Sequence, residues 1–218
     1  MKKYLIGTAM TVTLFFSVIL VSCSKNKDNR NTTNNLNSQV NNLPNEPLNT
    51  DERATLSFMR EEEKLARDVY VFLYNKWVLP IFNNISSSEQ SHMDAIVQLL
   101  NKYNLPDPVG SNGYGIFSNP LLQNLYTQLT TQGSVSLLDA LKAGATIEDL
   151  DIYDLKLSLT KIDNQDIILV YNNLMKGSRN HLRSFYSNII NAGGTYTPQY
   201  ITQAEFDAII NSPMETGN

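Results

Sequence analysis

The chain has 218 residues, and its 17 Lys and Arg against 21 Asp and Glu leave it slightly acidic. A single cysteine excludes an internal disulfide, so a hydrophobic core must hold the fold together. The part from Asp51 onward carries 12 basic and 19 acidic residues, a net charge of −7. Such a domain lacks the basic surface that nucleic-acid phosphates require, so we expect no nucleic-acid partner. Its charge is compatible with binding cations.

The first 22 residues have the pattern of a bacterial lipoprotein signal peptide. A short basic start precedes an apolar run from Tyr4 to about Val21, which ends in the lipobox Leu-Val-Ser-Cys. Cleavage before Cys23 would make this cysteine the lipidated first residue of the mature protein. The competing interpretation is an uncleaved signal anchor with an incidental cysteine. We therefore expect a location in the cell envelope, lipid-anchored to a membrane on the periplasmic or cell-surface side.

Residues 23–50 are interpreted as the lipidated cysteine and a disordered tether. From Ser24 to about Thr50 the chain is rich in Asn, with Ser, Thr, Lys and Pro and almost no apolar side chains. A segment of this composition cannot bury enough surface to offset its conformational entropy. The folded domain is therefore expected to span residues 51–218.

The expected domain shows helical periodicity throughout, with no hairpin signal and no sustained alternation, which predicts an all-α fold. Four long helices are expected at about 51–76, 80–103, 136–161 and 164–192, and a short one at 119–131. Another short helix should follow Thr202, with Glu205 in the capping-box position. Short connections within the first and last pairs and a long connection, 104–135, predict two antiparallel hairpins and one crossover. This is the arrangement of a ferritin-like four-helix bundle.

Carboxylates interrupt the apolar stripes of these helices, beginning with the run Glu61–Glu63. Glu62 has apolar residues three and four positions away on both sides, whereas two of the corresponding neighbours of Glu63 are arginines. We therefore expect Glu62 to point into the core and Glu63 to lie at a partly solvated edge. A buried glutamate is costly unless it is neutralised, hydrogen-bonded or bound to a cation. The competing interpretation is a solvated charge run whose helical phase is shifted by one residue.

The second expected helix carries a Glu-x-x-His motif, Glu89 to His92. Residues three apart lie on one face of a helix, so the carboxylate and the imidazole can bind one metal ion. Ser86 lies three residues before Glu89, and a capping box at a helix start is the alternative. The helical rhythm that begins at Pro80 favours a position inside the helix.

The third and fourth expected helices also carry polar residues within their apolar stripes. Glu148 and Asp151 repeat the three-residue spacing, although an acidic solvated face is the alternative interpretation. His181 has Leu174 and Phe185 on its face, and a core histidine or one paired with acids would look the same. Acids and imidazoles from four helices are the ligands of a carboxylate-bridged metal centre.

Several matched segments in order resemble the domain of unknown function 2202 family, a ferritin-like family whose own activity is not established. They are 58–70, 88–93, 152–155 and 177–182, and the resemblance covers nearly all of residues 51–200. It implies a four-helix bundle with a ferritin-type metal site, in which Glu62, Glu89 and His92 match the first half of the ligand set. The second half departs from the pattern, because Ser178 stands where a glutamate is expected. We infer that Asp151 supplies the missing carboxylate.

The leading hypothesis is a membrane-tethered protein that binds one or two iron or manganese ions, with oxidative chemistry of the ferroxidase or peroxidase-like class. The expected ligands are Glu62, Glu89, His92, Glu148, Asp151 and His181. Hard carboxylates with imidazole suit these metals. The expected substrate is a metal ion or a small oxidant, a dimer is compatible with the sequence, and Tyr70 and Tyr171 are candidate electron relays.

Two alternatives remain at this point. The first is a non-catalytic cell-envelope module that keeps the helical bundle but uses its core acids structurally, in pairs with Arg179, Arg183 and Lys64. The second is a hydrolytic site with a single metal, which the serine at position 178 would favour.

Overall fold

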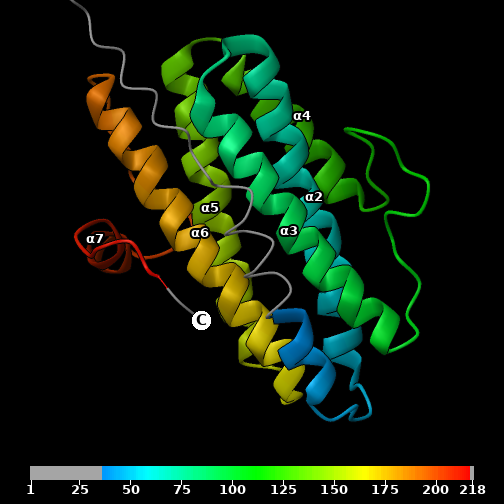
Figure 1. Cartoon of the computed structure of the whole chain (residues 1–218). Helices are drawn as coiled ribbons and strands as arrows, with labels where there is room; N and C mark the ends of the chain where they lie inside the picture. Colours follow the sequence, from blue (N-terminus) through cyan, green and yellow to red (C-terminus); the bar gives the residue numbers. More distant parts are fainter. Residues whose placement is uncertain (1–35, 217–218) are drawn as a thin grey trace, which may run out of the picture.

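The computed structural model describes residues 36–216, and within this range the chain forms helices connected by loops, with no strand. The all-α prediction is confirmed for this part of the chain (Figure 1). The helices are α2 (Thr50–Trp77), α3 (Pro80–Lys102), α4 (Pro120–Gly133), α5 (Leu137–Leu159), α6 (Gln165–Asn191) and α7 (Gln203–Ile210). Each lies within a few residues of its expected position.

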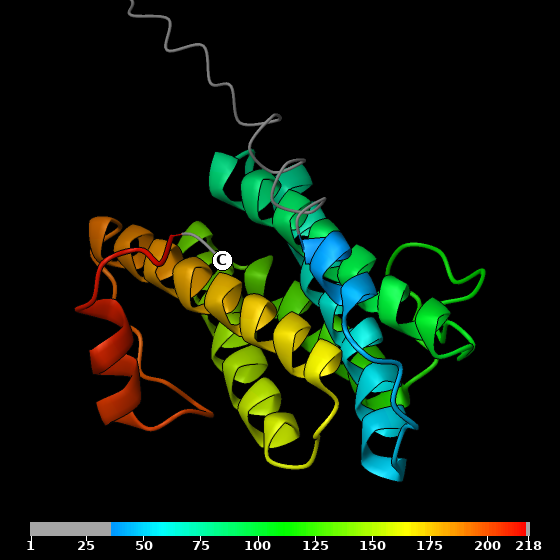
Figure 2. The ribbon, with the colours of Figure 1, turned by 60° about the horizontal axis from the view of Figure 1, so that its bottom comes forward.

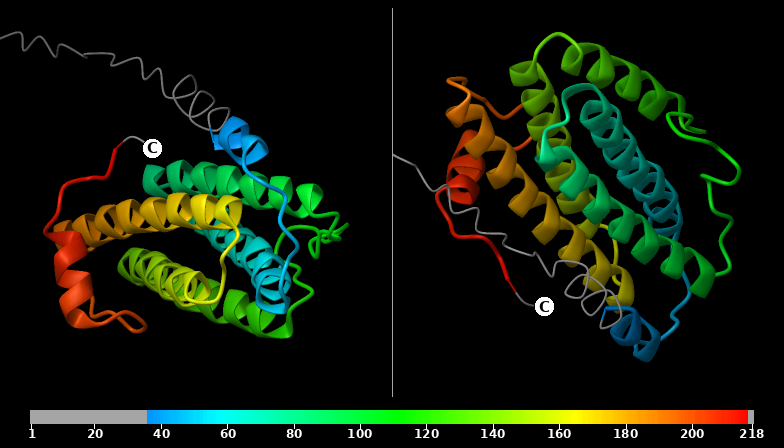
Figure 3. Two further views of the ribbon diagram at one scale, coloured as in Figure 1. Left: turned by 90° about the horizontal axis from the view of Figure 1, so that it is seen from below. Right: turned by 45° about the horizontal axis from the view of Figure 1, so that its top comes forward.

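The four long helices lie side by side as two hairpins, α2 with α3 and α5 with α6 (Figures 1 and 2). The hairpins meet through contacts of α2 with α5 and of α3 with α6. The short helix α4 packs across α2 and α5, and α7 packs outside α6 (Figure 3). The interior between the two hairpins is therefore bordered by all four long helices.

Local sequence signals explain where the long helices begin and end. Asn49 caps α2 in a reciprocal capping box with Glu52, and Ser136 caps α5. Val78 ends α2 in the left-handed conformation, with φ of 52°. Pro80 then opens α3 at a position where its missing N–H costs nothing. Because α3 begins at Pro80, Glu89 lies inside the helix, and the capping-box alternative at Ser86 is excluded.

Two hydrophobic clusters fill the interior, one toward each end of the long helices. On α2, Leu56 and Met59 belong to one cluster, and Leu65, Ala66, Val69, Tyr70 and Leu73 belong to the other. The three remaining long helices also contribute to both clusters. Between the clusters every long helix carries polar residues, and this layer contains Glu62, Glu63, Glu89, His92, Glu148, Asp151, Ser178 and His181. A polar layer thus lies between two apolar ones.

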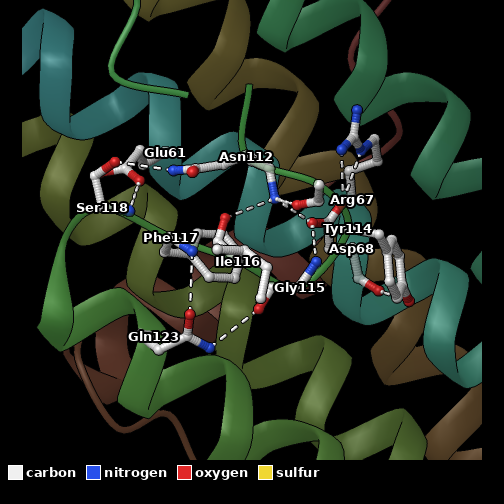
Figure 4. Close-up of polar contacts among 12 residues, drawn as sticks. Glu61, Arg67, Asp68, Asn112, Tyr114, Gly115, Ile116, Phe117, Ser118 and Gln123 are labelled. Carbon is white, nitrogen blue, oxygen red and sulfur yellow. Dashed lines mark hydrogen bonds and ion pairs between the residues drawn. The ribbon is translucent and has the colours of Figure 1, made fainter. Parts of the chain in front are cut away.

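Buried polar side chains of α2 hold the loop between α3 and α4 (Figure 4). Glu61 accepts hydrogen bonds from the backbone N–H groups of Ser118 and Asn119. Lys64 donates to Asp68 at 2.6 Å and to two loop carbonyl groups. Asp68 also accepts from the N–H of Gly115 at 2.9 Å. These charged residues are therefore satisfied by the loop they support.

The segment before α2 differs from the expected disordered tether. Residues 36–42 are helical and lie beside α3 and α6 (Figure 3), and the Val40 side chain is fully buried in one of the hydrophobic clusters. The Lys102 ammonium donates to the carbonyl groups of Val40, Leu43 and Pro44, at 2.9 to 3.2 Å. A few well-spaced apolar residues in an Asn-rich segment are enough for docking, which composition alone does not reveal.

The expected signal peptide, the lipobox with Cys23 and the first part of the tether lie outside the described residues. Within residues 36–216, no helix combines the length and apolar character that a membrane span requires.

Candidate metal centre

Three consecutive glutamates of α2 point in three directions, because each residue turns the helix by about 100°. Glu61 faces the crossover loop, as described above. Glu62 lies toward α5, where Asp154 is its neighbouring carboxyl group. Glu63 faces α3, where its Oε2 atom is 3.1 Å from Nδ1 of His92. All three side chains are buried.

The first candidate group of ligands consists of Glu63, Glu89 and His92. One ligand atom from each lies within 4.8 Å of the others. Nδ1 of His92 is 2.7 Å from Oε2 of Glu89 and 3.1 Å from Oε2 of Glu63. The Glu-x-x-His motif of α3 therefore converges with a carboxylate from α2.

The second candidate group consists of Glu89, Glu148 and His181, again within 4.8 Å of one another. Nδ1 of His181 is 2.8 Å from Oε1 of Glu89 and 3.4 Å from Oε2 of Glu148. Glu89 thus belongs to both groups, with one oxygen toward each histidine. The two imidazole rings lie 5.8 Å apart between centroids, nearly parallel at 27°.

The two histidines are the main partners of the carboxylates. Nδ1 of His92 bonds Oε2 of Glu63 at 3.1 Å, and both histidines form ion pairs with Glu89. Both oxygens of Glu89, Oε1 of Glu63 and Oε2 of Glu148 are buried and accept no hydrogen bond of ordinary geometry. Buried carboxylates with so few donors are expensive, and a bound cation would satisfy them.

Other buried acids of the same protein are fully satisfied. Glu52 accepts from the N–H groups of Asn49, Asp163 and Asn164. Asp149 accepts from three consecutive N–H groups, residues 199–201, and from the hydroxyl of Tyr196. The acids between the hydrophobic clusters lack such donors, and this contrast separates structural carboxylates from candidate ligands.

Burial and neighbouring charges shift the pKa values of the ligands in opposite directions. Burial raises the pKa of Glu63 to about 7, against the effect of His92. Burial also favours a raised pKa for Glu89, but the charges of His181 and His92 reverse this and lower it. Burial would lower the pKa of His181, but Glu89 and Glu148 raise it to about 10. In the metal-free protein, the protons retained by Glu63 and His181 reduce the net negative charge of the buried group.

Residues around the ligands hold the two histidine rings in place. Nε2 of His181 lies 3.1 Å from the hydroxyl of Ser88, a contact that fixes the orientation of the ring with Nδ1 toward Glu89 and Glu148. The ring of His92 lies against Gly177 of α6. A Cβ atom at position 177 would be 2.6 Å from Cε1 and Nε2 of this ring, so only glycine leaves it room.

The two tyrosines proposed as relays have different surroundings. Tyr70 is fully buried, and its hydroxyl donates to Glu148, a member of the second group. Tyr171 is also buried, but its hydroxyl donates to Thr55 at 3.3 Å, away from both groups. Ser178 bonds the carbonyl of Leu174 at 3.2 Å and does not replace the glutamate expected there.

The structure brings together four of the six expected ligands, Glu89, His92, Glu148 and His181. The phase prediction for α2 was wrong in one respect, since Glu63 is as buried as Glu62 and belongs to the first group. The reason is that α2 is covered by α3, α4, α5 and the crossover loop, so almost no side of it is solvated. Asp151 and Glu62 are buried without hydrogen-bond partners but belong to neither group.

Comparison with known proteins agrees with the resemblance noted from the sequence. The family described as "Uncharacterized protein domain (DUF2202)" matches residues 52–213. The uncharacterized protein MJ0754 of Methanocaldococcus jannaschii is 56% identical over 178 residues, 82% of this chain and 96% of the relative. The crystal structure of the hypothetical protein MJ0754 from Methanococcus jannaschii superposes with a TM-score of 0.78 at 57% identity, covering 79% of this chain and 99% of that one. The chain therefore belongs to the DUF2202 family of uncharacterized protein domains.

Proposed function

We propose that this protein is a ferritin-like four-helix bundle that binds two iron or manganese ions in its interior. Glu63 and His92 would hold one ion, Glu148 and His181 the other, and Glu89 would bridge them. Carboxylate oxygens with imidazole nitrogens and no thiolate are the donor set that these metals accept. The observation that carries the proposal is the set of buried ligand atoms that lack a hydrogen-bond partner.

The surrounding residues favour metal binding over a purely structural use of the acids. In the structural alternative, Arg179, Arg183 and Lys64 would pair with the core acids. Instead, Arg179 and Arg183 bond Glu215, at 2.7 and 3.0 Å, and Lys64 bonds Asp68. The basic side chains proposed as partners thus neutralise other carboxylates, and the acids of the centre are left without them.

Bound iron or manganese would supply oxidation chemistry with oxygen or peroxide, of the ferroxidase or peroxidase-like class. The chain's own residues position the ligands and control their protons. Ser88 orients the ring of His181, and the hydroxyl of Tyr70 orients Glu148. The two hydrophobic clusters exclude water on either side of the polar layer. Tyr70, in contact with a ligand, is the better placed of the two tyrosines to pass an electron.

Anaerobic loading with ferrous ion, followed by metal analysis of the desalted protein, tests the proposal. Wild type should retain two ions per chain, and Glu89→Gln should lose most of this binding because one carboxylate serves both groups. Asp94→Asn, an exposed acid on the same helix, is the charge-matched control and should bind like wild type. Equal and negligible metal content in wild type and Glu89→Gln would overturn the proposal.

The lipoprotein pattern of the first 23 residues supports a second proposal, that the domain is tethered to a membrane of the cell envelope through Cys23. Fractionation of cells that express the full chain tests it. Wild type should remain with the membrane fraction and carry the lipid mass on Cys23, whereas Cys23→Ser should be released. Identical fractionation of both proteins would contradict it.

A further inference from the structure

The proposed centre is enclosed, so a cation needs a path to it. The carboxylate ligands have at most 1% of their side chains exposed, and the two histidines 12%. On the histidine side, the outward nitrogen of His181 is already taken by Ser88. The opposite side, toward α5, is different, because carboxylates there continue beyond the two ligand groups.

A row of acids on α5 leads away from the centre. Glu148, Asp151 and Asp154 are each three residues apart, so each is a neighbour of the next and the three wind gradually around the helix. From first to last they span about 9 Å along the helix axis, at about 1.5 Å per residue. Glu148 belongs to the second ligand group, and Asp154 is partly exposed at the other end. The row connects the interior with the surface.

Glu62 of α2 faces this row from the other hairpin. It is fully buried, and neither of its carboxylate oxygens has a hydrogen-bond donor. Asp151 is 1% exposed and likewise has two oxygens without a partner. Burial raises the pKa of Asp151, and the charges of Glu62 and Glu63 raise it further. Four oxygens without donors are thus buried between the centre and Asp154.

At the surface end, Asp154 lines a pocket between the first turns of α2 and the last turns of α5. Its other lining residues are Asp51, Ala54, Thr55, Phe58, Leu157, Ser158 and Lys161. Phe58 lies one helical turn before Glu62, so the pocket floor adjoins the buried acids. The mouth offers two carboxylates and two hydroxyl groups, with one lysine at its rim, and suits a hydrated cation.

We propose that Asp154, Glu62 and Asp151 form an access route along which divalent cations pass from the α2–α5 pocket to the metal centre. The inference rests on the proposed function, because a route requires a destination. Each acid would replace part of the hydration shell of the ion in turn, the buried ones giving up a proton as the ion arrives, and the carboxylates at the pocket mouth would draw cations into it. None of the three is required to hold the ion once it is bound.

The rate of cobalt(II) binding, followed by its visible absorption in a stopped-flow instrument at low ionic strength, tests the route. Asp154→Asn and Glu62→Gln should each slow binding by about tenfold or more. Their final absorbance and stoichiometry should equal those of wild type. Asp94→Asn, which removes an exposed charge on α3, should bind at the wild-type rate. Both variants should remain stable, because Asp154 is partly exposed and Glu62→Gln removes a buried acid that has no hydrogen-bond donor.

The outcomes separate the route from the centre. Unchanged rates in both variants would overturn the route and assign access to the histidine side, while the metal proposal stands. Reduced stoichiometry in either variant would also overturn it, by making that acid a ligand. If wild type binds no cobalt at equilibrium, the centre itself fails, and the route fails with it.

Discussion

Replacing Gly177 with alanine should weaken metal binding far more than it weakens the fold. The new Cβ atom would lie 2.6 Å from Cε1 and Nε2 of His92, roughly 1 Å inside the optimum of about 3.5–4.0 Å for such contacts. The ring must move by about this amount, whereas ligand distances in metal sites tolerate about 0.2 Å. We therefore expect metal affinity to fall by about 10- to 100-fold, the usual effect of disturbing a residue that orients a ligand.

The cost to folding should be small. Overpacking costs about 1–3 kcal/mol, and alanine offsets up to about 1 kcal/mol of this through its helix propensity. Manganese titration by calorimetry measures the affinity, and urea unfolding of the metal-free protein measures the stability. Gly113→Ala is the control, because a Cβ atom there meets nothing within 4 Å. Wild-type manganese affinity in Gly177→Ala would refute the placement of His92 as a ligand.

The metal-free protein should lose stability as the pH rises from about 5 to 8, because the folded state holds protons that the unfolded chain releases. The pKa of Glu63 is raised from 4.5 to about 7 and that of His181 from 6.5 to about 10, so both shifts make stability fall as the pH rises. Urea unfolding at each pH measures this change, and stability that rises with pH would contradict it. Lys64→Met should cost about 1–3 kcal/mol, because Asp68 loses a buried charged donor but keeps Arg67 and the N–H of Gly115; an unchanged melting temperature would argue against the Lys64–Asp68 pair. Val40→Ala should cost about 1–2 kcal/mol for the lost buried methyl groups; no change would mean that residues 36–42 do not dock in solution.

Periodicity predicted the helices well because each long helix packs apolar residues at helical spacing on both sides of the polar layer. The same signal could not choose between Glu62 and Glu63. The helical phase of the apolar residues identifies a buried face only when the opposite face is solvated. The middle of α2 is covered on nearly all sides. The seven-residue spacing of Glu63 and Tyr70 places both on one face, but only the structure shows that Tyr70 bonds Glu148 of the second group.

The polar layer could be predicted in outline but not in its contacts. Glu89 and His92 are fixed relative to each other by helix geometry, and their spacing alone shows that they can share an ion. That Glu89 also meets His181 depends on the packing of α3 against α6, a long-range contact without a local sequence signal. The role of Gly177 is of the same kind, because only the position of His92 reveals what its missing side chain allows.

A crystal of the protein soaked with manganese tests the central claim most directly, because anomalous scattering locates the ions without reference to activity. Two anomalous peaks are expected in the interior between the four long helices. One should lie between Glu63 and His92 and the other between Glu148 and His181, with Glu89 in contact with both. An interior without peaks, in a crystal that shows manganese elsewhere, would contradict it.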